Sequence, residues 1–77
     1  MDLKRLKYFC KVVEQGSISQ AARALNMAQP PLSRRIQELE EELNAPLFIR
    51  NGNRIEPTEA GFFLYRKACD IFRQIED

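Results

Sequence analysis

The chain contains no histidine, and its only two cysteines, Cys10 and Cys69, lie far apart among its 77 residues. Two thiols do not complete a tetrahedral metal site, and a cysteine nucleophile without histidine lacks its usual base. The three scattered glycines form no phosphate-binding loop. We therefore expect no enzyme, no metal and no cofactor, and we interpret both cysteines as small apolar residues of a reducing compartment.

The chain also lacks any long apolar run, internal repeat or low-complexity segment. Four charged residues, Asp2, Lys4, Arg5 and Lys7, stand close to its beginning. This excludes a signal peptide or a membrane span, so we expect a cytoplasmic protein with no membrane partner. Seventy-seven residues make one small domain with little core, which favours oligomerisation.

The net charge is only +1, but it is unevenly distributed along the chain. Residues 1–37 carry a net charge of +5, and residues 38–59 carry −4. A nearly neutral chain of this kind is able to present one basic face to an anionic partner, although scattered solvated charges remain an equal alternative.

Four helices and one hairpin are expected. The first helix covers Leu3 to about Gln15, and Gly16 ends it. Its inner face is Leu6, Phe9, Cys10 and Val13. A second, short helix follows a capping box formed by Ser17 and Gln20, with Ser19 as the alternative cap. Its inner face is Ile18, Ala21, Ala22 and Leu25, side chains small enough for another helix to cross closely.

Asn26 and Met27 form the predicted turn, because asparagine tolerates a left-handed backbone. The next helix opens with Gln29, Pro30 and Pro31, where proline loses no intrahelical hydrogen bond. Its apolar stripe has spacings of four, three and four residues. The stripe is Leu32, Ile36, Leu39 and Leu43.

The side of this helix away from the stripe carries residues that suit DNA. Arg34 falls almost opposite the stripe, with Pro30 and Gln37 beside it, and Gln29 and Ser33 at its edge. Arginine, amide and hydroxyl groups bond to guanine edges, adenine edges and phosphates. The alternative is an ordinary solvated helix face.

The runs Leu47–Arg50 and Arg54–Pro57 flank an Asn51-Gly52-Asn53 turn and predict a hairpin with an arginine on each side. The alternative is a hairpin that only covers the core. The last helix begins at Thr58 as its N-cap. It has more apolar surface than one small core requires, which favours a seam between two chains, parallel or antiparallel, over a helix lying wholly on its own domain. The expected seam is Leu64, Ala68, Ile71, Phe72 and Ile75, and the apolar face is widened by Phe62, Phe63, Tyr65 and Cys69.

Five segments together resemble the DNA-binding domain of LysR-type transcriptional regulators. They are MDLKRLKYF at residues 1–9, GSISQAA at 16–22, AQPPLSR at 28–34, LEEEL with PLFIR at 39–43 and 46–50, and PTEAG at 57–61. One departure is Ala28, where the family commonly has a serine able to cap the helix or touch a phosphate.

The resemblance implies a mostly α-helical, bacterial winged helix-turn-helix: a three-helix core and β-hairpin wing in residues 1–57, and a linker and dimerisation helix in residues 58–77. It implies that Gln29, Pro30, Ser33 and Arg34 enter the major groove. Full-length members continue into an effector-binding domain. We expect this chain to lack that domain, so a small-molecule effector would act only through the missing domain. An oligomer larger than a dimer is expected only of the full-length protein.

We predict sequence-specific binding of an approximately palindromic double-stranded DNA operator by a homodimer; use of the fold for protein contacts alone is the alternative. The predicted DNA-contacting residues are Gln29, Pro30, Pro31, Ser33, Arg34, Gln37, Arg50, Arg54, Ser17 and Ser19.

Overall fold

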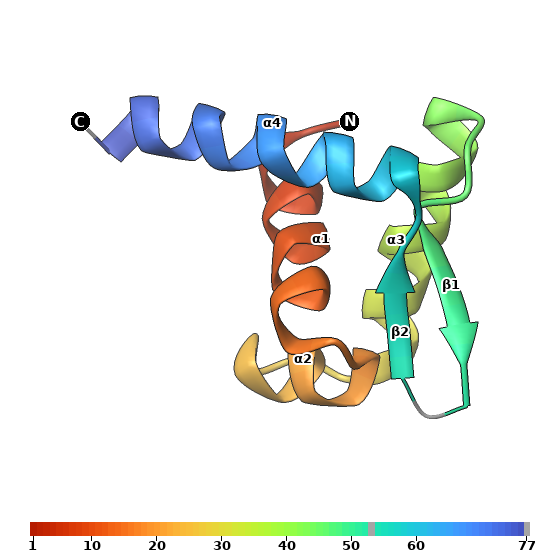
Figure 1. Ribbon diagram of the computed structural model, residues 1–77. Coiled ribbons are helices and arrows are strands. Elements are labelled where there is room, and N and C mark those ends of the chain that lie inside the picture. Colours follow the sequence, from red (N-terminus) through yellow and green to blue (C-terminus); the bar gives the residue numbers. More distant parts are fainter. Residues whose placement is uncertain (53, 77) are drawn as a thin grey trace.

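The computed structural model describes residues 1–52 and 54–76. It contains the helices α1 (Leu3–Gln15), α2 (Ile18–Ala24), α3 (Gln29–Leu43) and α4 (Glu59–Glu76), and the strands β1 (Phe48–Asn51) and β2 (Arg54–Pro57). α1 stands at the centre and packs against the other three helices, while α4 lies across one end of the molecule and α2 closes the other end (Figure 1). The predicted fold class, a helical core with a hairpin wing, is confirmed.

α1 begins and ends where its sequence predicts. The Asp2 carboxylate accepts a hydrogen bond from the Arg5 amide at 2.8 Å, and Gly16 ends the helix with a φ of 65°. One inner residue was misjudged: Val12 is fully buried and Val13 only half-buried. The reason is that α1 is covered by several neighbouring elements, so its buried surface is wider than one amphipathic stripe.

The α2 cap is Ser17, not Ser19. The Ser17 hydroxyl accepts a hydrogen bond from the Gln20 amide at 3.2 Å, and the Ser19 hydroxyl lies 3.0 Å from that of Ser17. Asn26 has a φ of 56°, which confirms the predicted left-handed turn between α2 and α3.

α3 starts at Gln29 without a side-chain cap, because Ala28 offers no hydroxyl. Leu32, Ile36 and Leu39 are buried as predicted. Leu43 is not part of this core: 38% of it is exposed, because it lies at the end of the helix just before the left-handed Asn44.

The wing is a two-stranded antiparallel hairpin in which Arg50 pairs with Ile55 and Asn51 with Arg54. β1 begins one residue later than predicted, since the buried Leu47 donates its amide to the Glu40 carboxylate at 2.7 Å instead. The Ile55 amide donates to the Gly16 carbonyl at 3.2 Å, which ties the wing to the α1–α2 corner. Asn53 of the predicted turn lies outside the described residues.

α4 is capped by Thr58, whose hydroxyl accepts a hydrogen bond from the Gly61 amide at 3.1 Å. Gly61 and Ala68 face the core and are buried. Ala68 is wholly inaccessible, so the prediction that it belongs to an intermolecular seam is wrong. Its small side chain instead allows α4 to cross close to the domain's own core, whereas Ile71 and Ile75 remain exposed. Asp77, the last residue of the predicted helix, lies outside the described residues.

Candidate nucleic-acid interface

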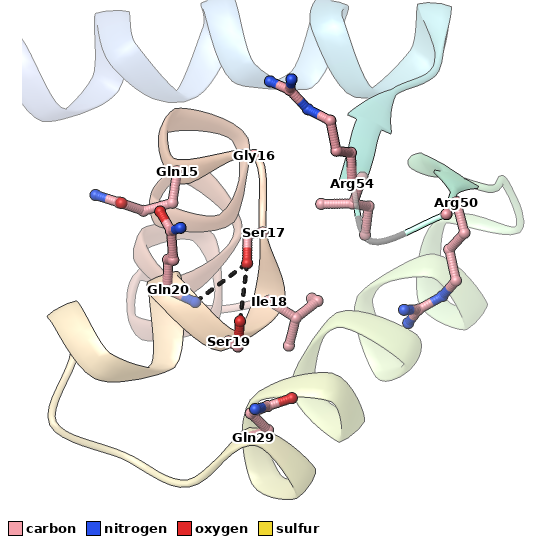
Figure 2. Close-up of a pocket in the computed structure, with 11 residues that line it drawn as sticks. Gln15, Gly16, Ser17, Ile18, Ser19, Gln20, Gln29, Arg50 and Arg54 are labelled. Carbon is pink, nitrogen blue, oxygen red and sulfur yellow. Dashed lines mark hydrogen bonds between the residues drawn. The ribbon is translucent and has the colours of Figure 1, made fainter.

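A groove of about 810 Å³ opens between the start of α2, the start of α3 and the wing (Figure 2). Polar side chains and two arginines surround it. The lining residues are Gln15, Gly16, Ser17, Ile18, Ser19, Gln20, Gln29, Arg50, Gly52, Arg54 and Ile55. The tertiary structure thus brings residues that are up to 40 positions apart in the sequence to one end of the molecule, opposite the end that α4 covers (Figure 1).

The first turns of α3 present most of the predicted reading side chains to solvent. Gln29, Pro30, Arg34 and Gln37 are exposed. Ser33 and Pro31 are half-buried. Exposure of Arg34 opposite buried Leu32 and Ile36 agrees with the helical pattern of the sequence.

Both wing arginines are exposed and line the groove, but their side chains leave the wing in different directions. Arg50 extends toward α3, on the same face of the hairpin as its partner Ile55 (Figure 2). Arg54 is the neighbour of Ile55 along β2, and successive residues of a strand point to opposite faces. The two arginines are therefore not equivalent, which the sequence pattern did not distinguish.

The two serines of the groove have different local tasks. Ser17 uses its hydroxyl oxygen to cap α2, while half-buried Ser19 stands at the rim with its hydroxyl beside that of Ser17 (Figure 2). A hydroxyl retains donor and acceptor capacity beyond one hydrogen bond. Ser19 is therefore the better placed of the two to bond an external phosphate.

Six residues that line the groove were missing from the predicted DNA-contacting set: Gln15, Gly16, Ile18, Gln20, Gly52 and Ile55. The sequence pattern assigns Gln20 only to a capping box, yet its side chain is exposed in the first turn of α2. In a helix-turn-helix, the first turn of α2 lies beside α3. The sequence signal for this part of the groove is therefore the pair of amide side chains on either side of Ser17, those of Gln15 and Gln20.

Part of the basic charge of residues 1–37 is paired with an acidic residue from residues 38–59. Glu38 of α3 lies 3.1 Å from the Arg5 guanidinium of α1 and 2.5 Å from that of Arg35. The hydrogen bond from Arg35, together with the nearby positive charges, holds the pKa of Glu38 below its ordinary value despite some desolvation. Two of the basic residues, Arg5 and Arg35, thus pair with Glu38, and Arg50 and Arg54 are the arginines that line the groove.

The protein-family model that matches this sequence is that of the bacterial regulatory helix-turn-helix proteins of the lysR family, over residues 3–62. That match covers all three core helices, the wing and the start of α4. The chain belongs to this family.

Two regulators illustrate how similar the relatives of this LysR-family chain are. It is 50% identical to the nitrogen assimilation regulatory protein nac of Klebsiella aerogenes and 45% identical to a probable cat1 operon transcriptional activator of Acinetobacter lwoffii, each over 99% of the chain. The chain spans about a quarter of the length of these curated relatives. They are regulatory proteins rather than enzymes.

Solved structures of the family superpose closely on this chain. The complex of the BenM DNA-binding domain with catB site 1 DNA matches with a TM-score of 0.94 and 43% identity, covering 99% of this chain and 84% of that one. The CbnR DNA-binding domain in complex with DNA matches with a TM-score of 0.93 and 37% identity, covering 99% and 87%.

Neither a membrane-spanning helix nor a group of three or more potential metal ligands is found among residues 1–52 and 54–76.

Proposed function

We propose that this chain binds double-stranded DNA sequence-specifically as the DNA-reading part of a bacterial transcriptional regulator, with α3 in the major groove. The observation that carries the proposal is the exposed N-terminal half of α3 beside a polar groove edged by arginines. A helix of this diameter fits the major groove, where base pairs are distinguishable by their donors and acceptors. Close superposition on DNA complexes of two LysR-type domains supports the same use.

Within this proposal, one set of residues contacts DNA bases and a second set contacts the sugar-phosphate backbone of the DNA. Arg34 and Gln37 project from the outer face of α3 and would bond to base edges, with Gln29 and Pro30 at its leading turn. Half-buried Ser33 and Pro31 line the flanks of the same helix. The residues that contact the DNA backbone are Ser17, Ser19, Arg50 and Arg54, which line the groove between α2, α3 and the wing.

Selection of binding sites from random DNA, followed by affinity measurements at several salt concentrations, tests this function. A common half-site should emerge, and the logarithm of affinity should fall linearly with the logarithm of salt concentration, because phosphate contacts release counterions. Failure to enrich any sequence, together with affinity that is independent of salt, would favour a protein-interaction module.

We further propose that residues 1–57 form the reading unit and that residues 58–77 pair two chains. α4 carries four exposed apolar side chains that its own domain leaves uncovered: Phe62, Phe63, Ile71 and Ile75, with exposed fractions of 54%, 56%, 40% and 59%. Half-buried Leu64 lies on the same side of α4 as Phe63, Ile71 and Ile75, whereas Phe62 and half-buried Phe72 lie on the other side of buried Ala68. We call Phe63, Leu64, Ile71 and Ile75 the pairing face.

An apolar groove of about 520 Å³ continues the pairing face onto the end of α3. Its lining is Leu43, Ala45, Leu47, Glu59, Ala60, Phe63 and Leu64. Exposed Leu43 and Phe63 at this groove provide apolar contacts for a second copy of the chain, since burying them removes them from water. Pairing of two reading units would account for binding to a two-part, approximately palindromic operator.

A further inference from the structure

The helix α4 is attached to the reading unit first through its N-terminal turn. The Thr58 amide donates to the Leu47 carbonyl at 2.9 Å, and the Thr58 hydroxyl donates to the Pro46 carbonyl at 2.7 Å. Gly61 comes so close to the same Leu47 carbonyl that a Cβ atom on it would lie 2.2 Å from the oxygen. These contacts hold one point of the helix against the loop before the wing.

A second attachment lies one turn further along α4. The Tyr65 hydroxyl donates to the Glu14 carboxylate of α1 at 3.0 Å, across 51 residues of sequence. Lys11 lies 3.6 Å from the same carboxylate group. Among the described residues, no hydrogen bond or ion pair joins α4 to another element beyond Tyr65.

The far end of α4 projects past α1, away from the rest of the molecule (Figure 1). Ile75 follows Gly61 by 14 residues, a length of about 21 Å at 1.5 Å per residue. A tilt of about 10° around Gly61 would therefore move Ile75 by about 4 Å, close to the rise of one base pair. Apolar packing of buried Ala68 and half-buried Phe72 against the core also resists such a tilt, but it is non-directional. The hydrogen bond at Tyr65 is the directional contact that opposes it.

The Tyr65 hydroxyl must be protonated to donate a hydrogen bond to Glu14. Desolvation and the neighbouring Glu14 and Cys69 side chains raise the pKa of Tyr65 above its ordinary value. The hydroxyl therefore keeps its proton throughout the neutral pH range and remains a donor to Glu14.

We propose that Tyr65 and Glu14 are positioning residues for paired DNA binding: their hydrogen bond sets the angle between α4 and the reading unit, and with it the half-site spacing that two paired chains accept. The inference rests on the proposed function, because spacing has a meaning only when two chains bind together. Neither residue belongs to the groove or to the pairing face.

The test compares Tyr65→Phe with the wild type on duplexes carrying two selected half-sites, at the selected spacing and with one or two base pairs added or removed. Wild-type chain should prefer the selected spacing by about tenfold, as linked sites do when their geometry matches. For Tyr65→Phe this preference should fall to about two- to threefold, while affinity for a duplex with a single half-site stays unchanged.

Two further variants separate positioning from general packing. Glu14→Gln keeps an acceptor for the tyrosine hydroxyl and should retain the spacing preference, whereas Glu14→Leu should lose it as Tyr65→Phe does. Tyr8→Phe removes the chain's other tyrosine hydroxyl and serves as the matched control, with wild-type preference expected.

The outcomes that contradict the inference are distinct. An unchanged spacing preference in Tyr65→Phe overturns it, and so does an equal loss of affinity on every duplex, including the single half-site. Wild-type chain that binds a single half-site but has no preference for spacing refutes the proposed pairing, and the inference with it. Wild-type chain that binds no selected sequence refutes DNA reading itself.

Discussion

Among single residues, Arg34 has the clearest link between sequence position and proposed role. It is exposed on the outer face of α3, while Leu32 and Ile36 hold the opposite face in the core. Arg34→Ala should cost about 1–3 kcal/mol of specific binding and relax the preference at one base position in each half-site. Competition binding against a series of mutated operators measures both effects.

The fold should tolerate this substitution, because the side chain contributes nothing to the core. Thermal unfolding of Arg34→Ala within a few degrees of the wild type is the control. Unchanged affinity and unchanged base preference in the variant would show that Arg34 does not contact base edges in the major groove of DNA.

Cys10 makes stability depend on pH. Burial, more than the nearby Cys69 and Glu14, raises the pKa of its thiol from 9.0 to about 12. Unfolded chain releases this proton above about pH 9 and folded chain retains it, so the stabilisation is complete below pH 9 and is lost as the pH rises toward 12. The loss should approach about 1.4 kcal/mol per pH unit in that window.

Urea unfolding of the wild type and of Cys10→Ala between pH 8 and about pH 11 checks this expectation. The variant is less stable at pH 8 because it loses buried volume, but its stability should fall less steeply with pH. Parallel plots of unfolding free energy against pH for the two proteins would show that the Cys10 thiol contributes nothing to the pH dependence. The contribution of Tyr65 is present in both proteins and cancels in their difference.

In the wing, both arginines line the same groove, but their side chains leave the hairpin in different directions. Arg50 extends toward α3, and Arg50→Ala should weaken binding to operator and random DNA by similar factors. The slope of log affinity against log salt should flatten by about one unit if a single phosphate contact is lost.

Arg54→Ala provides the matched comparison on the facing strand. Loss of operator affinity alone, in either variant, would mean that the arginine reads a base or a narrowed minor groove instead of a phosphate.

The attachment of α4 depends on the absence of a side chain at residue 61. Alanine normally favours a helix over glycine by about 1 kcal/mol. At Gly61, however, the added methyl group would lie 2.2 Å from the Leu47 carbonyl oxygen, which is backbone and also accepts the Thr58 amide. We expect Gly61→Ala to destabilise the chain by about 1–3 kcal/mol, measured by urea unfolding.

Gln74→Ala, at an exposed position of the same helix, is the control and should be neutral or slightly stabilising. If Gly61→Ala matched Gln74→Ala in stability, α4 would have to shift away from Leu47 without cost. The close approach of Gly61 to Leu47 would then not be required for the stability of the fold.

In the whole molecule, α4, which carries the pairing face, lies at one end, and α2, which borders the polar groove, lies at the other end (Figure 1). Ile71→Glu places a carboxylate on the pairing face, where association would bury it without a partner. The variant should be monomeric in sedimentation velocity, and its affinity for a two-part operator should fall by about 10²-fold or more while single half-site binding persists.

Gln74→Glu adds the same charge to an exposed polar position of α4 and should leave pairing intact. Wild-type chain that remains monomeric at high concentration and binds one half-site one-to-one would refute the pairing proposal.

Local sequence signals predicted the elements and their ends well. The left-handed Asn26, the Ser17 and Thr58 caps and the hairpin all occur where short-range chemistry requires them. Arg34 was placed correctly for the same reason: helical periodicity alone determines which face of α3 opposes Leu32, Ile36 and Leu39. The sequence by itself therefore determined the helices, the hairpin and the outward face of α3.

Only the tertiary structure decided which apolar and charged residues find partners. Val12 is enclosed because several elements surround α1, and Ala68 is buried because α4 crosses closely at a small residue. Arg5 and Arg35 meet Glu38 only when α1 and α3 pack. Periodicity describes one helix at a time, whereas burial and ion pairing depend on contacts between segments distant in the chain, so the groove between α2, α3 and the wing exists only in the folded molecule.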